Sequence, residues 1–469
     1  MFIQINRDND EKYIYQQIYE AIKNQILKRV LPVHEKLPSK RELATKLQVS
    51  VNSVTLAYEQ LLAEGYIYTI ERSGHYVEEI KLFDVDTQIQ KDFPEDLKEI
   101  PAEREGWLSL SHMSTNSSLF PFTKWLKHQT EAINLFSKEL CELSEPQGPY
   151  ILRQNIANLI LSTRGVHCEP EQIIIHSTSQ GLLEQFLSLQ ASDSVFAIEN
   201  PGYARYYKLL MRHHVKIEII PLDKNGVDIH VLSNGQSKFL ITTPSHQFPT
   251  GRIMPISRRI ELLNWALEKD DRYIIEDDYD SDFKYKTDNI PSLQSLDYNQ
   301  RVIYMGTFSK TLLPGMRISY MVLPPKLLRK YRAYFSTLIQ PANSLAMYTL
   351  NHFIETGAYQ KHVRKMNYVY EKLRAVLIEK LTRLFQERIE ITNIPAGLHF
   401  LVKVHTQKTY EEIEIDLVKQ KLELYTIRRF LIQDDPTYLN ERYLIIGFAN
   451  INLEEIDEAL SRLNRVLFE

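Results

Sequence analysis

A lysine flanked by hydroxyl groups follows one of the apolar β-type runs of the chain. Residues 306–317 read GTFSKTLLPGMR and come directly after the run 302–305. An amine at the mouth of a strand can form a Schiff base with a carbonyl carbon, and hydroxyls with a following arginine suit a phosphate group. We therefore expect Lys310 to bind pyridoxal 5′-phosphate through its amine. The phosphate would be held by Thr307, Ser309 and Arg317.

A second polar segment supplies an acid and a phenol at the end of another predicted strand. Residues 274–280 read IIEDDYD, so Asp277 and Tyr279 are two positions apart and point the same way on an extended chain. A carboxylate there can keep the pyridine nitrogen of the cofactor protonated, and the phenol can donate to its 3-oxygen. The separation between Asp277 and Lys310 fits one strand-to-strand crossover of about 30 residues.

Three more segments at predicted strand ends fit the same ligand. Residues 177–181, STSQG, lie between a strand and a helix, where free backbone N–H groups and the helix dipole favour a phosphate. Residues 199–203, ENPGY, end the next strand and can bring the ring of Tyr203 over the face of the cofactor. The turn 243–251, TPSHQFPTG, adds His246. The ligands expected from the first segment are Ser177, Thr178, Ser179 and Gln180.

Each segment taken alone has a plainer interpretation. A lysine after a strand is usually a solvated loop residue, an acidic run is typical of a solvent-facing turn, and 177–181 would serve as an ordinary helix cap. Their joint order and spacing favour the cofactor site. Cys141 and Cys168 are too few for a zinc cage or a disulfide framework, and no metal site is predicted.

These segments need a framework that brings strand ends together. From Trp107 onward, apolar β-type runs alternate with helical stretches such as 179–189, which predicts an α/β domain with a largely parallel sheet over residues 107–342. A long helical stretch from Asn343 leads to a small α+β region, so residues 343–469 form the C-terminal helix and small domain. The charged stretch 81–106 shows no apolar period and is predicted to be a linker.

Whole-chain composition narrows the class of protein. The 469 residues are long enough for about three domains, and 43% hydrophobic content excludes disorder over most of the chain. A net charge of −4 excludes a bulk polycation. The apolar runs are too short for a transmembrane helix, and residues 1–8 lack a secretion signal. We expect a cytoplasmic protein with no membrane partner.

Residues 1–80 carry the pattern of a winged helix-turn-helix. Helical spacing over 13–29, 40–47 and 52–64 predicts three helices, and two β-rich runs at 66–70 and 75–77 predict a wing. Ten basic residues against eleven acidic ones would not by themselves indicate DNA binding, and a small helical interaction module is the alternative. The polar start of the third helix is nevertheless where a recognition helix meets base edges.

The DNA-binding candidates lie on two helices and the wing. Basic and polar side chains gather around the second helix and the first turns of the third, and two more lie where a wing meets phosphate or the minor groove. They are Lys40, Arg41, Ser50, Asn52, Ser53, Thr55, Arg72 and His75.

These motifs resemble two known families. From Trp107 onward the chain resembles fold-type I pyridoxal phosphate aminotransferases in 243–251, 275–280 and 304–310, and residues 10–80 resemble GntR-type regulators in PSKRELA and in 54–65. Their fusion resembles the MocR subfamily, most of all its γ-aminobutyrate-responsive members. Two positions depart from the pattern. His246-Gln247 occupies the region where aminotransferases place an asparagine that bonds the cofactor's 3-oxygen, and Val51 follows Ser50 where GntR readers commonly have arginine.

The resemblance implies a regulator rather than an enzyme. It implies that promoter double-stranded DNA is bound, that γ-aminobutyrate is sensed by aldimine formation, that genes for its use are activated and that the regulator's own gene is repressed. It also implies a head-to-tail homodimer, with RNA polymerase as a further candidate partner. Arg205 and Arg429 match the positions that hold the effector carboxylate, and Arg428 competes with Arg429 because one residue of slip exchanges them.

Two alternatives remain open at this stage. The protein could be a working aminotransferase that carries a DNA-binding domain, since the apparatus for at least a half-reaction is present. It could also be a DNA-binding protein with a vestigial, cofactor-free domain. Repeated turnover with an amine and a 2-oxo acid would favour the first, and an absorbance spectrum distinguishes the second.

Overall fold

The computed structural model describes residues 3–6, 12–80, 93–99, 104–113, 116–285, 290–392 and 394–469. The chain divides into two compact units, Met1–Glu103 and Arg104–Glu469, each described by itself below. Of the predicted linker 81–106, residues 81–92 and 100–103 lie outside the described residues, and a short 3₁₀ helix spans Glu95–Leu97. In the described part of the chain, no helix is both long and apolar enough to cross a membrane.

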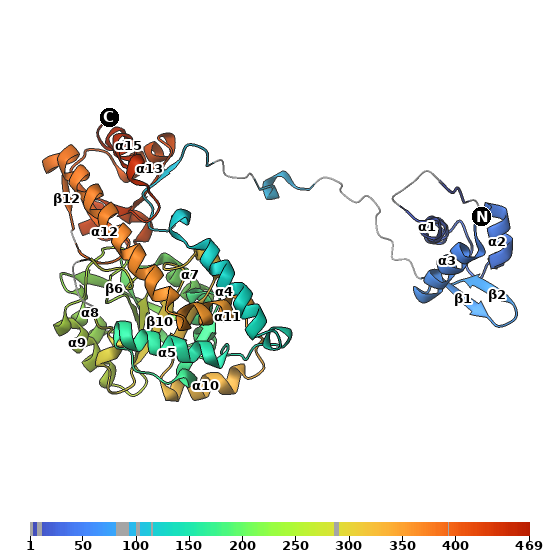
Figure 1. Ribbon diagram of the computed structural model, residues 1–469, viewed down its shortest axis with the longest axis horizontal. Coiled ribbons are helices and arrows are strands. Elements are labelled where there is room, and N and C mark those ends of the chain that lie inside the picture. The colour runs from blue at the N-terminus through green and yellow to red at the C-terminus, as the bar shows by residue number, and fades with distance from the viewer. Residues whose placement is uncertain are drawn as a thin grey trace. The chain divides into compact units, whose positions relative to one another are not determined.

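The N-terminal unit is the predicted winged helix-turn-helix (Figure 1). Its helices are α1 (Ile14–Leu27), α2 (Lys40–Leu47) and α3 (Val51–Ala63), and its antiparallel wing strands are β1 (Ile67–Ile70) and β2 (Gly74–Val77).

Local chemistry explains where the helices of this unit begin. The Ser39 hydroxyl accepts the Glu42 N–H at 3.2 Å, and the Glu42 carboxylate accepts the Ser39 N–H, which makes a capping box at α2. Ser50 caps α3 by accepting the Ser53 N–H at 3.1 Å. The apolar faces of the three helices then pack on Leu61 and its buried neighbours, which form one small core.

The large domain is built on an eight-stranded sheet with the order β4-β11-β10-β9-β8-β5-β6-β7. The five central strands from β10 to β6 run parallel, while β4, β11 and β7 pair through antiparallel contacts, so the predicted largely parallel sheet is confirmed. The strands are β4 (Ile173–His176), β5 (Val195–Asn200), β6 (Lys216–Asp223), β7 (Gly226–Val227), β8 (Phe239–Thr242), β9 (Tyr273–Asp278), β10 (Val302–Thr307) and β11 (Ser319–Val322).

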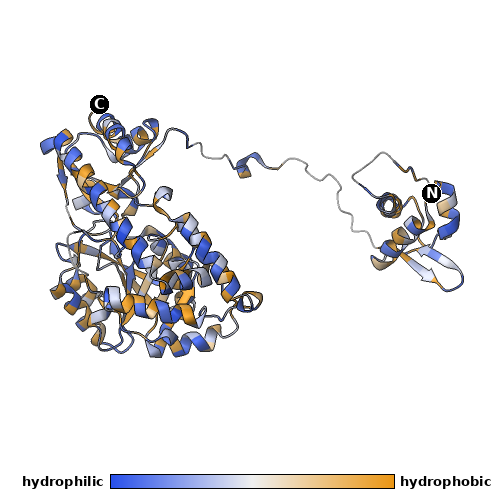
Figure 2. Ribbon diagram, in the orientation of Figure 1, coloured by the Kyte–Doolittle hydropathy of each residue, from blue (hydrophilic) through white to orange (hydrophobic). Residues whose placement is uncertain are grey.

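Helices cover both faces of this sheet because the strands are apolar on both sides. Ile303 and Met305 pack with α6, α7 and α10, whereas the intervening Tyr304 packs with α5 and α11 on the opposite face. Helices α4 and α11 lie side by side next to α5 (Figure 1), and the peripheral helices alternate polar and apolar residues along their length (Figure 2). The helices are α4 (Phe122–Leu135), α5 (Tyr150–Arg164), α6 (Ser179–Ser188), α7 (Ala204–Arg212), α8 (Ile229–Asn234), α9 (Ile256–Leu267), α10 (Pro325–Phe335) and α11 (Ser344–Glu355).

The 28-residue helix α12 (Ala358–Phe385) leads from the large domain into the small one (Figure 1). There, a four-stranded sheet has the order β12-β13-β16-β15 and packs on α12, α13 and α15. Strand β3 (Leu108–Ser109) pairs with β14 (Leu422–Glu423), so the start of the segment predicted as large domain lies with the small domain. The small-domain elements are β12 (Ile389–Ile391), β13 (His399–Val404), α13 (Tyr410–Lys419), β15 (Tyr425–Thr426), α14 (Pro436–Leu439), β16 (Arg442–Gly447) and α15 (Ile456–Phe468).

Candidate functional site

A cavity of about 270 Å³ opens at the carboxyl ends of the parallel strands. This is the edge where α/β sheets bind ligands, because the loops after successive strands meet there. Eleven of the predicted cofactor and effector residues line it, while Ser177, His246 and Arg429 do not. The eleven are Thr178, Ser179, Gln180, Tyr203, Arg205, Asp277, Tyr279, Thr307, Ser309, Lys310 and Arg317.

Lys310 lies in the turn after β10, half-buried, and its Nζ donates a hydrogen bond to the backbone carbonyl of His112 at 2.8 Å. Burial lowers the pKa of the lysine amine, Asp280 opposes this shift through its negative charge, and the positive charge of Arg205 adds to it. The amine is therefore more easily deprotonated than that of an exposed lysine. A neutral amine is the form that attacks a carbonyl carbon.

Asp277 also lines the cavity, is buried, and accepts a hydrogen bond from the Tyr206 hydroxyl at 2.9 Å. Burial raises the pKa of the Asp277 carboxyl to about 7, against the hydrogen bond from Tyr206 and together with the nearby carboxylates. A cationic pyridine nitrogen next to this group would favour its ionised form. The sequence analysis did not identify Tyr206, although it lies three residues after Tyr203.

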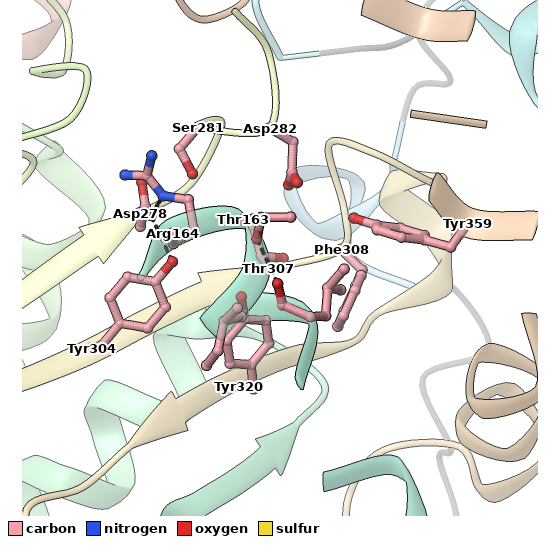
Figure 3. A pocket seen from close by; sticks show the side chains of 12 residues that line it. Thr163, Arg164, Asp278, Ser281, Asp282, Tyr304, Thr307, Phe308, Tyr320 and Tyr359 are labelled. Carbon is pink, nitrogen blue, oxygen red and sulfur yellow. Dashed lines mark hydrogen bonds and ion pairs between the residues drawn. The ribbon is translucent and has the colours of Figure 1, made fainter. Parts of the chain in front are cut away.

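Asp278, the acidic residue that follows Asp277, has a structural role. Asp278 points to the other face of the sheet, where its carboxylate accepts from Arg164 Nε at 2.7 Å and from the Tyr304 hydroxyl at 2.6 Å. Figure 3 shows these three side chains directed at one another beside a second, much smaller cavity, which Thr307 also lines. Arg164 comes from α5 and fixes the end of β9. No local spacing could have indicated it.

The start of α6 and the turn after β10 form an anion site. Thr178 caps α6 by accepting the Gly181 N–H at 2.8 Å, so the first turn of the helix directs free N–H groups at the cavity. Thr307 accepts the Ser309 N–H at 3.2 Å, and the exposed side chain of Arg317 extends from the same turn. Ser177 points elsewhere, with its hydroxyl 3.3 Å from Nδ1 of His176.

The structure places His246 behind Tyr279 rather than on the cavity wall. Its Nδ1 is 2.9 Å from the Tyr279 hydroxyl oxygen. His246 would therefore act on a ligand through the Tyr279 phenol and not by direct contact. Two other residues of the turn 243–251, Thr243 and Phe248, line the cavity instead, while Gln247 is engaged by backbone groups of the same turn.

The two competing arginines of the small domain have different surroundings. Arg428 is ion-paired with Glu411 and, at 2.6 Å, with Glu414. Arg429 is exposed, makes no ion pair among the described residues, and lies over the ring of Tyr425 at 4.3 Å. Its charge contributes, after burial and Lys310, to holding the pKa of His112 well below the ordinary histidine value. Because His112 lines the cavity, Arg429 is the arginine of the pair that has a free guanidinium near it.

Four of the eight candidate DNA-binding residues of the N-terminal unit are exposed, and the other four are half-buried. Arg41, Asn52 and Arg72 are exposed, and the two arginines form no ion pair within the described residues. Lys40 lies 4.0 Å from Glu59, and the hydroxyls of Ser50 and Ser53 are 2.8 Å apart. Thr55 is half-buried on α3.

His75 differs from the other candidates of this unit. It packs edge-on against Tyr58, with ring centroids 5.2 Å apart, and its Nδ1 lies 3.0 Å from the Thr69 hydroxyl. It therefore braces the wing against α3.

Comparison with known proteins identifies the architecture. Residues 107–463 match the family Aminotransferase class I and II, and residues 14–77 match Bacterial regulatory proteins, gntR family. The chain is 36% identical over 450 residues to the uncharacterized HTH-type transcriptional regulator YdeL of Bacillus subtilis (strain 168), covering 96% of each chain. The chain belongs to the HTH-type transcriptional regulators with an aminotransferase domain.

Two further similarities support this membership. The regulator is 26% identical to the probable rhizopine catabolism regulatory protein MocR of Rhizobium meliloti, covering 98% of this chain and 94% of the relative. Its fold is similar to that of LysN, an α-aminoadipate aminotransferase from Thermus thermophilus, with a TM-score of 0.68, 23% identity, and coverage of 77% and 92% of the two chains.

The cofactor of the aminotransferase domain is pyridoxal 5′-phosphate, as the family match requires. The cavity offers groups for each part of this molecule: an amine at Lys310, a carboxyl at Asp277, and the helix start with Arg317 for an anion. The donor set thus fits the cofactor.

Proposed function

We propose that this regulator binds promoter DNA and senses an amino compound, γ-aminobutyrate, through pyridoxal 5′-phosphate held by Lys310. The observation that carries the proposal is that Lys310 and Arg205 line one cavity of about 270 Å³. An amine-reactive centre together with a guanidinium suits a ligand that has an amine at one end and a carboxylate at the other.

Lys310 is the residue that exchanges with the effector. Bound pyridoxal 5′-phosphate supplies a carbon that bonds reversibly to amines and a ring that withdraws electrons from it. In an exchange, Lys310 would be released as its amine, and the hydrogens of the effector amine would pass to the lysine nitrogen. No oxidant and no water are consumed. The lowered pKa of Lys310 supports the loading of the site, because attack on the carbonyl needs the neutral amine.

The effector carboxylate would be held by Arg205 and Arg429. Arg205 lines the cavity, and Arg429 has its guanidinium free of ion pairs in the described part of the chain. Arg428 is the weaker candidate because binding a carboxylate there would first break its pairs with Glu411 and Glu414.

The choice of γ-aminobutyrate rests on the resemblance of 243–251, 275–280 and 304–310 to GabR, the regulator responsive to that compound. The same resemblance supports activation of genes for its use, repression of the regulator's own gene, and a cytoplasmic head-to-tail homodimer acting with RNA polymerase. Exposed apolar side chains on α4, Leu126 and Leu135, offer surface that a second copy can cover.

DNA binding would use the polar start of α3 in the major groove. Asn52 has an exposed amide at this position, which suits bidentate contact with a base edge. Arg41 and Arg72 would contact phosphates on either side.

The proposal is tested by titrating the cofactor-loaded protein with three compounds and following its visible absorbance. γ-Aminobutyrate should shift the spectrum at low concentration, n-butylamine, which lacks the carboxylate, only at much higher concentration, and butyrate, which lacks the amine, not at all. Equal responses to γ-aminobutyrate and n-butylamine would contradict the arginine clamp. Absence of a visible band would favour the cofactor-free alternative.

A second candidate function is a working aminotransferase. It is favoured by the intact set of Lys310, Asp277, Tyr279 and Arg317 around one cavity. A steady-state assay with γ-aminobutyrate and a 2-oxo acid separates the two. Turnover at ordinary enzymatic rates, about 1 to 1,000 per second, would establish the enzyme, whereas a sensor should stop at or near one equivalent.

A further inference from the structure

Behind Tyr279, two buried side chains form a hydrogen-bonded group that the cofactor assignment does not use. His246 and Asp280 are each 2% exposed. Nδ1 of His246 is 3.0 Å and 3.2 Å from the two carboxylate oxygens of Asp280, and 2.9 Å from the Tyr279 hydroxyl oxygen. Asp280 also accepts the backbone N–H of Leu398 at 3.2 Å. Two side chains, Asp280 and Tyr279, therefore converge on a single ring nitrogen.

The position of one proton decides how this group works. An ionised carboxylate can only accept, so a close contact with Asp280 requires that Nδ1 of His246 carry the hydrogen. The other ring nitrogen, Nε2, is buried and has no hydrogen-bond partner within the described residues. A hydrogen on Nε2 would be an unsatisfied buried donor, which is costly. These contacts place a ring hydrogen on Nδ1 and leave Nε2 as a bare lone pair.

The hydroxyl of Tyr279 is oriented as a consequence. With the Nδ1–H occupying its His246 side, the Tyr279 oxygen acts there as an acceptor and cannot donate to the ring. Burial and the Asp280 carboxylate, which can accept the hydroxyl hydrogen, raise the pKa of Tyr279 well above its ordinary value, so the phenol keeps this hydrogen. A protonated phenol on the cavity wall can donate this hydrogen to an anionic oxygen in the cavity instead of to Asp280.

The surrounding backbone holds the ring in this position. A Cβ on Gly397, whose φ is +70°, would come within 2.0 Å of Cε1 of His246 and 2.7 Å of the Asp280 carboxylate, so only glycine permits the approach. His399 lies beside His246 with ring centroids 4.7 Å apart, and its Nε2 donates to the Pro249 carbonyl at 3.1 Å. Burial, with the neighbouring His246 and His112, keeps the pKa of His399 well below its usual value, so His399 is neutral.

His246, Asp280 and His399 are also residue types that bind metal ions, and they lie close together. The geometry disfavours that use. Asp280 is at the Nδ1 edge of His246, whereas the bare nitrogen is Nε2, so the carboxylate and the free lone pair do not point to a common centre.

We propose that Asp280 and His246 are positioning residues that direct the Tyr279 hydroxyl as a donor to the 3-oxygen of the cofactor. This rests on the cofactor role of Lys310 proposed above. The arrangement takes the place of the asparagine that aminotransferases use for the same contact, a residue that the turn 243–251 lacks. By stabilising negative charge on that oxygen, it favours the unprotonated form of the bond between Lys310 and the cofactor.

The test uses substitutions that mimic one ring nitrogen each. The amide nitrogen of His246→Asn can reach the Nδ1 position, whereas that of His246→Gln reaches the Nε2 position. In the cofactor-loaded protein, the pH midpoint of the visible absorbance change should rise by about one unit in His246→Gln and His246→Ala, as expected for losing one hydrogen bond to a charged oxygen. It should stay near the wild-type value in His246→Asn.

Two further measurements separate positioning from a general structural role. If His246 acts through Tyr279, the double variant His246→Ala/Tyr279→Phe should have the midpoint of Tyr279→Phe alone. In the cofactor-free protein, nitrogen NMR should show His246 protonated on Nδ1. Additive midpoint shifts, an Nε2-protonated ring, or about one zinc ion per purified chain would each overturn the inference. Wild-type protein without a visible band would instead overturn the cofactor role of Lys310.

Discussion

Replacing Arg429 with alanine should weaken the response to effector while leaving the fold and the cofactor in place. The structure shows what the substitution removes: an exposed guanidinium that lies 4.3 Å from the ring centroid of Tyr425 and forms no ion pair with any described residue. Loss of an exposed cation–π contact costs about 0.5 to 1 kcal/mol of stability. Loss of a charge-assisted hydrogen bond to the effector carboxylate costs about 1.5 to 3 kcal/mol of binding, which is about 10- to 150-fold in affinity.

Arg428→Ala is the matched control. Its pairs with Glu411 and Glu414 involve side chains that are at least a third exposed, and such pairs contribute about 0 to 1 kcal/mol. Absorbance titration with γ-aminobutyrate gives the affinity of each variant, and the intensity of the visible band without effector reports cofactor loading. Unchanged affinity in Arg429→Ala, or a larger loss in Arg428→Ala, would refute the assignment of Arg429.

Two other perturbations probe the DNA-binding face and the buried acid. Arg41→Ala and Arg72→Ala should weaken binding to all DNA sequences, and each should reduce the slope of log affinity against log salt concentration by about one. Asn52→Ala should instead change the preference between sequences by about 1 to 3 kcal/mol. If salt titrations of operator and unrelated DNA showed no change in these variants, α3 and the wing would not be the contact surface. In the cofactor-free protein, the pKa of Asp277 is raised to about 7, against about 3.9 in an unfolded chain, so the folded state binds this proton more tightly. The free energy of unfolding should therefore fall as pH rises between those two values, by up to about 1.4 kcal/mol per pH unit. Asp277→Asn should flatten this part of the thermal-stability profile, and a profile parallel to wild type would show that the carboxyl titrates normally.

Much of the cofactor site could be predicted because parallel strands bring their carboxyl ends to one edge. Lys310, Asp277 and the start of α6 are far apart in the chain, yet each follows an apolar run at the spacing of a strand followed by a turn. Once the sheet is parallel, these turns must meet. The three helices and the wing were predictable for a similar reason, since their caps at Ser39 and Ser50 are local signals.

The features that could not be predicted depend on contacts between residues far apart in the chain, which leave no pattern in the local sequence. Arg164 reaches Asp278 across 114 residues, and Ser109 of β3 reaches Glu423 of β14 across 314, from a two-residue strand with no periodicity to detect. His246 was expected to face the cofactor, but a turn has no repeat that tells which side chains point inward. Arg428 and Arg429 adjoin in a single 3₁₀ turn, so only their carboxylate neighbours distinguish them.

The most direct test of the account is the variant Lys310→Ala, compared with wild type in operator binding and in a reporter assay with and without γ-aminobutyrate. The substitution removes the amine but keeps the start of α6, Arg317 and the separate N-terminal unit. The account predicts that the variant loses the visible band and the effector-dependent activation, while its mobility-shift affinity for the operator remains within about threefold of wild type, a change of less than about 1 kcal/mol. Normal activation by γ-aminobutyrate in Lys310→Ala would contradict it.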